Sequence, residues 1–304
     1  MRYKLIAIDL DGTLLNRDHS VSAANVRAIA RAREAGATVV VCTGRGLVES
    51  RQAIDAIGQT EPVIVAGGSI IADPTNGSTL HRFPMDRGIV RDASELLLGH
   101  GFPVLVLKDS SAVGYDYLVI EGDERHPLDP ITLWWFGKMD VTWRTAASLD
   151  DDEHPEHTVR FGVCGRASEL SVVRSRVHER FGERVMVMHF PAVVAPGATL
   201  GGAVGSSAGQ MRIDEEIDIF EVFDRRANKW SALSYLAGEL GVEPNAIAAI
   251  GDQVNDVEMI QHAALGVAMG NATEQIKGLA NVTTASNAED GVAVAIERML
   301  DGSW

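Results

Sequence analysis

Near its N-terminus the chain contains the segment Leu5-Ile6-Ala7-Ile8-Asp9-Leu10-Asp11-Gly12-Thr13. A short apolar run bounded by a turn signal is typical of a strand buried on both faces of a parallel sheet. We therefore expect a strand over residues 4–8 that ends in a turn carrying the carboxylates of Asp9 and Asp11. Because an isolated Asp-x-Asp-Gly is commonly just a turn, its meaning depends on the rest of the chain.

Helix and strand patterns alternate in the segments that follow. They are a helix from Ser22 to Gly36, a strand over 39–42, a helix over 46–57 and a third buried strand over 62–66. The second strand leads into Thr43-Gly44-Arg45 and the third into Gly67-Gly68. This βαβ succession predicts an α/β fold with a doubly wound, Rossmann-like parallel sheet.

The same pattern returns near the C-terminus. A helix from Lys229 to Leu240 precedes a strand over 246–250, which ends in Gly251-Asp252. Two further short strands alternate with helices after it. Residues 1–83 and 225–304 are therefore expected to form one core.

The middle of the chain has a different pattern of apolar residues. Strands with alternating apolar residues mix there with helical patterns over 87–99 and 168–181. We expect an inserted α+β domain over residues 84–224. Within it, the acidic turn 150–153 and the Gly-rich stretch 197–209 are expected to be surface loops rather than binding elements.

The charge of the chain narrows the classes of partner. Its 304 residues include 27 Lys and Arg against 42 Asp and Glu, a formal net charge of −15. A field of that sign repels nucleic acid and anionic membrane surfaces, so we expect neither as a partner. A small phosphorylated molecule can still bind where a metal ion and one or two cationic side chains reverse the potential locally.

Cysteine content and hydropathy indicate a cytoplasmic protein. Cys42 and Cys164 lack the spacing of a disulfide framework or a zinc site. Asp9 interrupts the first apolar run before it reaches the length of a signal-peptide core, and no apolar stretch approaches the length of a membrane span. The sequence carries no signal for the oligomeric state.

Polar residues follow three of the expected strands at their carboxyl ends, where open parallel sheets bind ligands. These residues are Asp9 and Asp11, then Thr43, then Asp252, Asn255 and Asp256. Two carboxylates at alternate positions can divide the chemistry of a phosphate ester. One attacks phosphorus, while the other donates a proton to the leaving oxygen and later takes one from water. The pattern therefore favours a phosphoryl-transfer site.

The first turn also suits a phosphate and a metal ion. Gly12 permits close backbone approach, so the main-chain N–H groups from Leu10 to Gly12 can face the phosphoryl oxygens. Oxygen ligands from Asp9, the Asp11 carbonyl and Asp252 suit a small, hard cation that keeps several waters. This ligand set indicates Mg²⁺ rather than zinc.

Other ligand-binding loops fit less well. A calcium-binding loop would carry its glycine at the sixth rather than the fourth place from Asp9, and a glutamate where Ser20 stands. Gly44-Arg45-Gly46 begins like a dinucleotide-binding fingerprint, but Glu49 replaces the third glycine, and no Walker pattern occurs. Gly251-Asp252 taken in isolation is equally compatible with a helix N-cap and nothing more.

Taken in order, four segments resemble the four motifs of the haloacid dehalogenase (HAD) superfamily of phosphatases. They are Asp9-Leu10-Asp11-Gly12-Thr13, Thr43-Gly44-Arg45, Lys229 and Gly251-Asp252-x-x-Asn255-Asp256. The insertion between the second and third motifs is similar to the C2-type cap of the Cof-like subfamily. The resemblance covers essentially the whole chain and implies a HAD-like catalytic core, an α+β cap and a Mg²⁺-dependent reaction through an aspartyl phosphate.

The resemblance implies roles for the acidic residues. Asp9 is the expected nucleophile and Asp11 the general acid and base. Asp252 is the expected third Mg²⁺ ligand beside Asp9 and Asp11. Asp256 is expected to orient Lys229 or a metal-bound water from outside the ligand sphere.

The remaining positions are implied to bind phosphate or substrate. Thr43 with Gly44, Lys229 and Asn255 are expected phosphate ligands, beside the backbone of Leu10 and Gly12. Arg45 is expected to face the cap and, with Gly67 and Gly68, to contact substrate. Relatives usually carry Asn-Gly where this chain has Gly67-Gly68, and Lys-Gly where Trp230 follows Lys229. The first difference removes one expected polar contact, and the second implies different packing near Lys229.

Three functions are compatible with this pattern. The leading one is Mg²⁺-dependent hydrolysis of a small phosphorylated metabolite, such as a sugar phosphate, with the cap selecting the substrate. A phosphomutase-type transferase of the same superfamily is a second, and it would need a cap that excludes water. The third is a non-catalytic phospho-acceptor or metal-binding module. Asp11 speaks against it, because an acid/base group beside Asp9 would hasten breakdown of the acyl phosphate.

Overall fold

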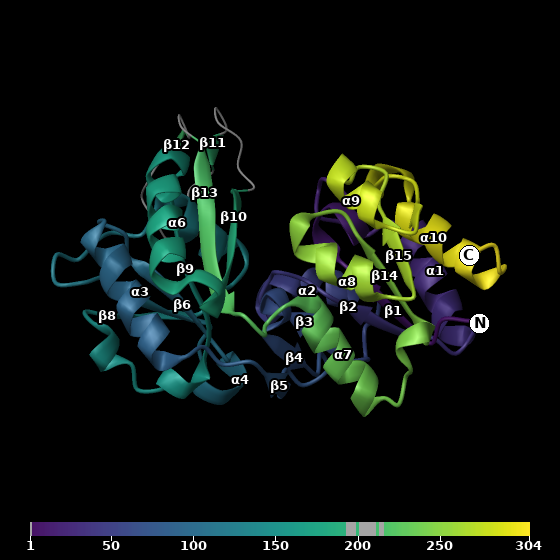
Figure 1. Cartoon of the computed structure of the whole chain (residues 1–304), viewed down its shortest axis with the longest axis horizontal. Coiled ribbons are helices and arrows are strands. Elements are labelled where there is room, and N and C mark those ends of the chain that lie inside the picture. The colour runs from purple at the N-terminus through teal and green to yellow at the C-terminus, as the bar shows by residue number, and fades with distance from the viewer. Residues whose placement is uncertain (1, 193–198, 201–210, 213–215) are drawn as a thin grey trace. The chain divides into compact units, whose positions relative to one another are not determined.

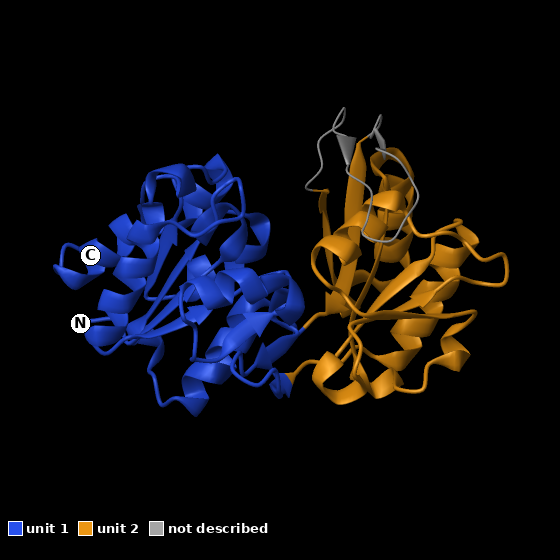
Figure 2. Cartoon of the chain, turned by 180° about the vertical axis from the view of Figure 1, so that it is seen from behind, with its two compact units in different colours: residues 1–81, 226–304 blue, residues 82–225 orange. Residues whose placement is uncertain are grey.

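The computed structural model describes residues 2–192, 199–200, 211–212 and 216–304. The chain divides into two compact units, Met1–His81 with Arg226–Trp304, and Arg82–Arg225 (Figure 2). The expected Gly-rich loop 197–209 lies largely outside the described residues. The assignment of the first unit as catalytic core and of the second as cap stays a prediction.

The first unit is built around a five-stranded parallel sheet with the strand order β16-β15-β14-β1-β2 (Figure 1). Its strands are β1 (Leu5–Ile8), β2 (Thr38–Val41), β14 (Ile247–Gly251), β15 (Leu265–Ala268) and β16 (Val282–Thr283). From β1 the chain proceeds to β2 on one side, whereas from β14 it proceeds to β15 on the other. The direction of winding therefore reverses between β1 and β14, where such sheets bind ligands. This confirms the doubly wound α/β fold.

Helices follow the strands of this sheet (Figure 1). They are α1 (Ala23–Glu34), α2 (Leu47–Ala56), α7 (Lys229–Glu239), α8 (Val257–His262), α9 (Glu274–Leu279) and α10 (Gly291–Leu300). The expected cap of α1 is present, since the Ser22 side chain accepts a hydrogen bond from the Asn25 N–H at 3.1 Å. Gly36 follows the helix with φ +84°, a conformation that glycine adopts without a Cβ penalty.

The third expected strand pairs differently from the other two. β3 (Val63–Val65) pairs antiparallel with β4 (Ile70–Ala72) in a small sheet that also contains β5 (Thr79–Arg82). A single parallel bridge between Cys42 and Ile64 links it to the end of β2. Gly67 and Gly68 have φ values of 68° and 101°, and this left-handed turn reverses the chain where a helix would otherwise follow. The third expected strand is therefore present, and the chain after it turns back into β4.

The second unit is an α+β structure built on a six-stranded sheet of order β10-β13-β9-β6-β7-β8. Its strands are β6 (Val104–Lys108), β7 (Tyr117–Ile120), β8 (Trp143–Ala146), β9 (Thr158–Arg166), β10 (Val185–Pro191) and β13 (Ile217–Asp224), with a separate pair β11 (Thr199–Leu200) and β12 (Met211–Arg212). Neighbouring strands run antiparallel except for β7 and β8. The sequence did not mark β13 as a strand.

Helices of the second unit pack against this sheet. They are α3 (Arg87–Gly99), α4 (Ser110–Val113), α5 (Pro130–Lys138) and α6 (Ala167–Phe181). The apolar sides of α3 and α6 share one buried core with β6, β9 and β13, in which Leu97, Val173 and Phe161 are fully enclosed. Burial of this kind is the main favourable term in the folding of the unit.

The acidic turn 150–153 of the second unit is not simply a surface loop. Asp152 is buried and forms an ion pair with the buried Lys108. The Lys108 ammonium also donates to Thr158 Oγ1 at 2.8 Å and to the His154 carbonyl at 3.1 Å. A buried ammonium needs a counter-charge, so the expected surface loop is wrong at Asp152.

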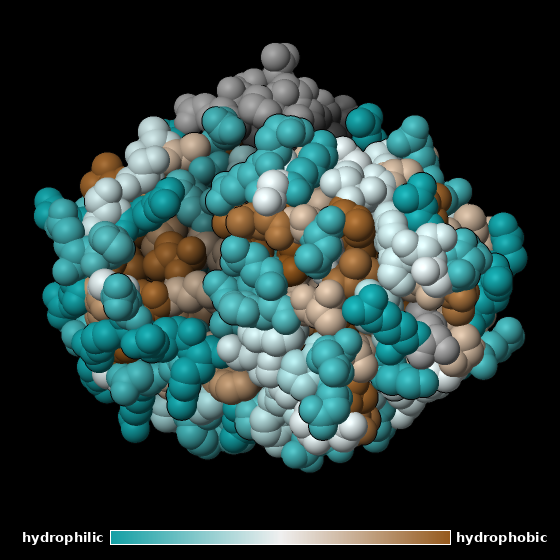
Figure 3. Space-filling model, turned by 45° about the vertical axis from the view of Figure 1, so that its right-hand side comes forward, coloured by the Kyte–Doolittle hydropathy of each residue, from teal (hydrophilic) through white to brown (hydrophobic). Residues whose placement is uncertain are grey.

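On the face drawn in Figure 3, hydrophilic side chains predominate and the hydrophobic ones gather in separate patches. Among the described residues, none of the helices combines the length and the apolar composition that crossing a bilayer would require.

The buried pair of the second unit leads to a stability prediction. Asp152→Asn leaves the Lys108 ammonium buried without its counter-charge, and we expect it to lower the free energy of unfolding by about 3–5 kcal/mol. Asp150→Asn removes only an exposed pair with Arg91 and should cost less than about 0.5 kcal/mol. Denaturant unfolding followed by tryptophan fluorescence compares the two variants. Equal, small effects would contradict the structural role of Asp152.

Candidate active site

Three strands of the first unit deliver polar side chains to one place. Asp9 directly follows β1 and Thr43 lies just beyond β2, while Asp252 follows β14. The backbone N–H of Asp9 donates to the Ile250 carbonyl at 3.1 Å, which ties the ends of β1 and β14 together. The three side chains are buried. The convergence expected from the strand ends is therefore present in the structure.

Lys229 is the centre of this cluster. It is the first residue of α7, and its Nζ donates to Asp9 Oδ1 at 2.5 Å and to Asp256 Oδ1 at 2.6 Å. Its side chain is only 1% exposed. The other oxygen of Asp256 accepts the backbone N–H groups of Asp252 and Gln253 at 2.9 and 3.0 Å. Asp256 thus orients the lysine and the backbone that carries Asp252.

The acidic residues of the cluster could hold a cation. Asp9, Asp252 and Asp256 each offer a carboxylate oxygen, and these oxygens lie within 4.8 Å of one another. Because Lys229 and two N–H groups already engage both oxygens of Asp256, Asp9 and Asp252 are the better placed ligands. Thr13 Oγ1 donates to Asp252 Oδ1 at 2.9 Å and fixes that carboxylate. Hard oxygen donors of this kind suit a small divalent cation.

Burial and mutual repulsion change the acidity of these groups. Burial raises the pKa of Asp9 well above its usual value, and the nearby Asp256 carboxylate adds to the rise, against the pull of Lys229. Burial and Asp256 likewise raise the pKa of Asp252 to about 6. Burial alone would lower the pKa of Lys229, but the carboxylates of Asp256 and Asp9 outweigh it and raise that pKa. The lysine therefore remains charged, whereas ionisation of the two carboxylates is disfavoured.

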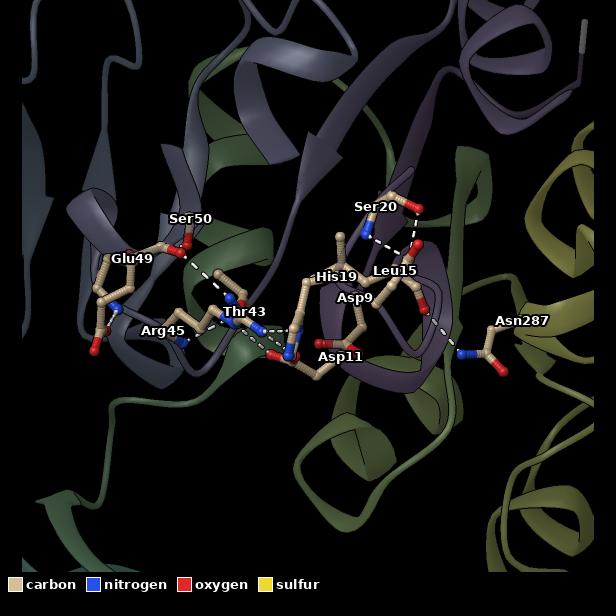
Figure 4. Close-up of polar contacts among 12 residues, drawn as sticks. Asp9, Asp11, Leu15, His19, Ser20, Thr43, Arg45, Glu49, Ser50 and Asn287 are labelled. Carbon is tan, nitrogen blue, oxygen red and sulfur yellow. Dashed lines mark hydrogen bonds and ion pairs between the residues drawn. The ribbon is translucent and has the colours of Figure 1, made fainter. Parts of the chain in front are cut away.

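Asp11 lies outside this buried cluster. Its side chain is 50% exposed, and both of its carboxylate oxygens are bound by Arg45 (Figure 4). Arg45 Nε donates to Asp11 Oδ2 at 2.7 Å, and Nη2 donates to Oδ1. Within the first unit, the side chain of Arg45 is thus directed at Asp11, a partner that the sequence did not indicate.

The turn after β1 approaches the cluster closely because it contains a glycine. Gly12 has φ +77°, and a Cβ built there would lie 2.2 Å from Asp252 Oδ2. Leu10, by contrast, is a buried apolar residue whose side chain anchors the turn in the core. A side chain at position 12 would therefore displace the Asp252 carboxylate.

Gly44 and Asn255 are neighbours beside the cluster. A Cβ built at Gly44 would lie 3.9 Å from Asn255 Nδ2. Asn255 Oδ1 is buried and has no hydrogen-bond partner within the described part of the chain. Thr43 Oγ1 accepts the backbone N–H of Arg45 at 3.1 Å. The unsatisfied amide oxygen of Asn255 indicates that a donor, such as a water or a ligand group, belongs beside it.

Gly67 and Gly68 support the site through their backbone. The Gly67 N–H donates to the Thr43 carbonyl at 2.9 Å. A Cβ at Gly68 would lie 2.3 Å from the backbone carbonyl group of Asn228 and 2.8 Å from the backbone nitrogen of Lys229. This turn therefore packs directly against the start of α7. Trp230, which replaces the glycine usual in similar sequences, stacks on His262 with ring centroids 5.6 Å apart.

Several residues near the site were not indicated by the sequence. Thr13 lies in the first motif, but the sequence pattern indicates no role for its side chain. His19 contacts Arg45 through its Nδ1 at 3.2 Å from Nη2. Asn271 Nδ2 donates to the Gly12 carbonyl at 2.8 Å, and Asn287 Nδ2 to the Leu15 carbonyl at 2.8 Å. Isolated polar residues of this kind carry no spacing signal, so only the folded chain identifies them.

Comparisons with known proteins agree with this geometry. The family model described as haloacid dehalogenase-like hydrolase matches residues 6–189 and 205–296. The chain is 30% identical to the phosphatase YwpJ of Bacillus subtilis over 98% of its own length and 100% of that protein. It is 28% identical to the B. subtilis 5-amino-6-(5-phospho-D-ribitylamino)uracil phosphatase YwtE, over 99% of both chains. The crystal structure of a haloacid dehalogenase-like hydrolase from Bacteroides thetaiotaomicron superposes with a TM-score of 0.75 at 26% identity, covering 98% of this chain and 99% of that one.

The close approach at Gly68 leads to a prediction with a matched control. Gly68→Ala and Gly36→Ala both place a Cβ at positive φ, but nothing lies within 4 Å of a Cβ at Gly36. We expect Gly36→Ala to cost about 1–2 kcal/mol of unfolding free energy from backbone strain. Gly68→Ala should cost about 1–3 kcal/mol more, because it pushes against the backbone of Asn228 and Lys229. Equal losses in denaturant unfolding would show that the turn does not support the start of α7.

Proposed function

Since the chain belongs to the haloacid dehalogenase-like hydrolases and is a phosphatase, we propose that it hydrolyses a small phosphorylated metabolite with Mg²⁺ through a phosphorylated Asp9. The observation that carries this proposal is the buried contact of Lys229 with Asp9 and Asp256, beside Asp252. A carboxylate held by an ammonium at a strand end is a fixed nucleophile. The same ammonium offers positive charge to an incoming phosphoryl oxygen.

The charge balance of the cluster supports a divalent cation. With three ionised carboxylates and one ammonium, Asp9, Asp252, Asp256 and Lys229 together carry a surplus of two negative charges. When bound by Asp9 and Asp252, with the Asp11 carbonyl as a further oxygen, Mg²⁺ would offset this surplus and attract the phosphate. Phosphate ligands would come from the backbone of Leu10 and Gly12, from Thr43 with Gly44, and from Lys229 and Asn255.

The two aspartates of the first turn divide the reaction into two steps. A carboxylate oxygen of Asp9 attacks phosphorus, and the bond from phosphorus to the leaving oxygen breaks as the protonated Asp11 carboxyl gives that oxygen its proton. Water then attacks phosphorus and gives a proton to the Asp11 carboxylate. The bond from phosphorus to Asp9 breaks, which releases inorganic phosphate and restores both aspartates.

The substrate class is proposed from the relatives and from the chemistry of the site. One of them is named for a phosphorylated ribityl compound, and small phosphate esters of this kind fit a site that recognises chiefly the phosphate. We extend that class to this chain as a sugar phosphate or similar metabolite. The second unit, as a cap, would select among such esters, with Gly67 and Gly68 as contacts from the first.

Removal of the nucleophile tests the proposal directly. Asp9→Asn keeps a hydrogen-bonding group beside Lys229, so the fold should survive, while turnover should fall by at least about 10³-fold. The measurement is phosphate release, with Mg²⁺, from the best substrate in a panel of sugar phosphates. In Asp11→Asn the phosphoenzyme should accumulate and be detectable by intact mass. Full activity in Asp9→Asn would reject the mechanism.

The raised pKa of Asp252 predicts how metal binding depends on pH. Without metal, its folded-state pKa of about 6 lies above the ordinary 3.8, so its contribution to stability is greatest below pH 3.8 and is lost as the pH rises through 6. Mg²⁺ requires the ionised carboxylate. Its stabilising effect, about 2.7 kcal/mol at 100 times Kd, should therefore appear at pH 7.5 and diminish at pH 5.

Thermal unfolding with and without Mg²⁺ at the two pH values measures this effect. Asp252→Asn should abolish the metal-dependent rise in Tm at pH 7.5. A rise that is equal at both pH values, or that persists in the variant, would place the cation elsewhere.

A further inference from the structure

The carboxylate of Asp11 is held in one orientation, although an exposed aspartate side chain can usually rotate. Its carboxylate is half exposed and stands in a turn, where an aspartate can adopt several rotamers. Here both of its oxygens are bound by the guanidinium of Arg45, whose Nε lies 2.7 Å from Oδ2 (Figure 4). A planar fork of two donors fixes the plane of a carboxylate as well as its place.

Arg45 is in turn held at both ends. Its backbone N–H donates to Thr43 Oγ1 at 3.1 Å, and its carbonyl accepts the Ala66 N–H at 2.7 Å. At the other end, Nη1 donates to the Glu49 carbonyl at 3.3 Å, and Nη2 lies 3.2 Å from His19 Nδ1. The side chain of Arg45 is only 10% exposed. The guanidinium is therefore a rigid donor rather than a solvated charge that happens to meet Asp11.

The conformation of His19 supports this interpretation. His19 has φ +63°, which is uncommon for a residue with a Cβ and has a cost in free energy. Its loop is closed by the bridge between Leu15 and Val21. The strained backbone brings the imidazole to the edge of the guanidinium (Figure 4). Strained residues of this kind occur most often where a functional group must be placed.

We propose that Arg45, supported by His19, is the positioning residue of Asp11, and this rests on the proposed function of Asp11 as acid and base. Arg45 holds the carboxyl group at the rim of the cluster, so that it meets the leaving oxygen and later the attacking water without a search among rotamers. Because the Asp11 side chain is half exposed, solvent screens its ion pair with Arg45, and orientation is the main effect of the contact. Arg45 then acts through Asp11 and not by contact with the phosphate.

The basicity of the leaving group distinguishes an Arg45 that orients Asp11 from an Arg45 that contacts the phosphate. A strongly basic leaving oxygen needs the proton of Asp11, whereas a weakly basic one departs without it. Phenyl phosphate and p-nitrophenyl phosphate present nearly the same shape but leaving oxygens of very different basicity. Loss of Asp11 orientation must therefore slow the hydrolysis of phenyl phosphate far more than that of p-nitrophenyl phosphate. Loss of a phosphate contact must slow the hydrolysis of both esters.

The experiment compares single-turnover release of the two phenols, with Mg²⁺, by the wild type, Arg45→Met, Arg45→Lys and His19→Ala. We expect Arg45→Met to slow phenyl phosphate by about 10²-fold and p-nitrophenyl phosphate by less than about 5-fold, with KM nearly unchanged. Arg45→Lys should lie between Arg45→Met and the wild type, because one ammonium cannot reproduce the fork. Arg31→Met, which removes an exposed arginine paired with Glu297, is the matched control and should match the wild type.

A double variant tests whether the two residues act as one unit. Added to Asp11→Asn, Arg45→Met should cause no further loss, because an arginine that works only through Asp11 has nothing left to orient. Additive losses, equal losses on both esters, or a rise in KM alone would overturn the proposal. If Arg45→Met fails to fold, Arg45→Lys and His19→Ala must show the same dependence on the leaving group, or the proposal is wrong.

Failure of the proposed function gives a different result. In that case the wild type releases neither phenol with Mg²⁺, or Asp9→Asn remains as active as the wild type. The proposed role of Arg45 is then rejected together with the proposed function. If the wild type is active and Asp9→Asn is not, the leaving-group comparison decides on Arg45 alone.

Discussion

The neutralisation of one buried ammonium organises the first unit. Lys229 is almost completely enclosed, and a charge in that position is tolerable only if carboxylates surround it. Asp9 comes from the end of β1 and Asp256 from the turn after β14, so the ion contacts bring α7 and two strands to one point. The turn at Gly68 completes the enclosure by packing against the start of α7. The geometry of the site is thus a condition for burying the lysine.

Ionisation of all three carboxylates around Lys229 would leave an excess of negative charge that the protein alone does not balance. Burial raises the pKa of Asp9 and of Asp252, which means that their ionised forms are unfavourable without a partner. A hydrophobic cluster of the same size would cost the fold less. The site therefore resembles other functional sites in which local stability is sacrificed to hold reactive groups in place.

The sequence predicted those parts of the structure that follow from a pattern of neighbouring residues. Apolar runs followed by Asp9, Thr43 and Asp252 predicted strands whose ends converge, and they do. The pairing of β3 with β4 was not anticipated, because it depends on the left-handed turn at Gly67 and Gly68. Asp152 appeared to be one of several surface acids until its partner Lys108 was known. The contact between Arg45 and Asp11 likewise joins residues that lie far apart in the chain, and local patterns contain no information about such pairs.

The division of the first unit into two distant segments constrains how the chain can fold during synthesis. Leu5 pairs with Ile247, and the N–H of Asp9 bonds to Ile250, so the central sheet cannot close until the ribosome has made almost the entire chain. The second unit is continuous in sequence and can complete its own core beforehand. Contacts of such long range are slow to form. Until β14 is available, the edge of β1 that it will cover is unpaired, and an unpaired strand edge exposes the nascent chain to aggregation.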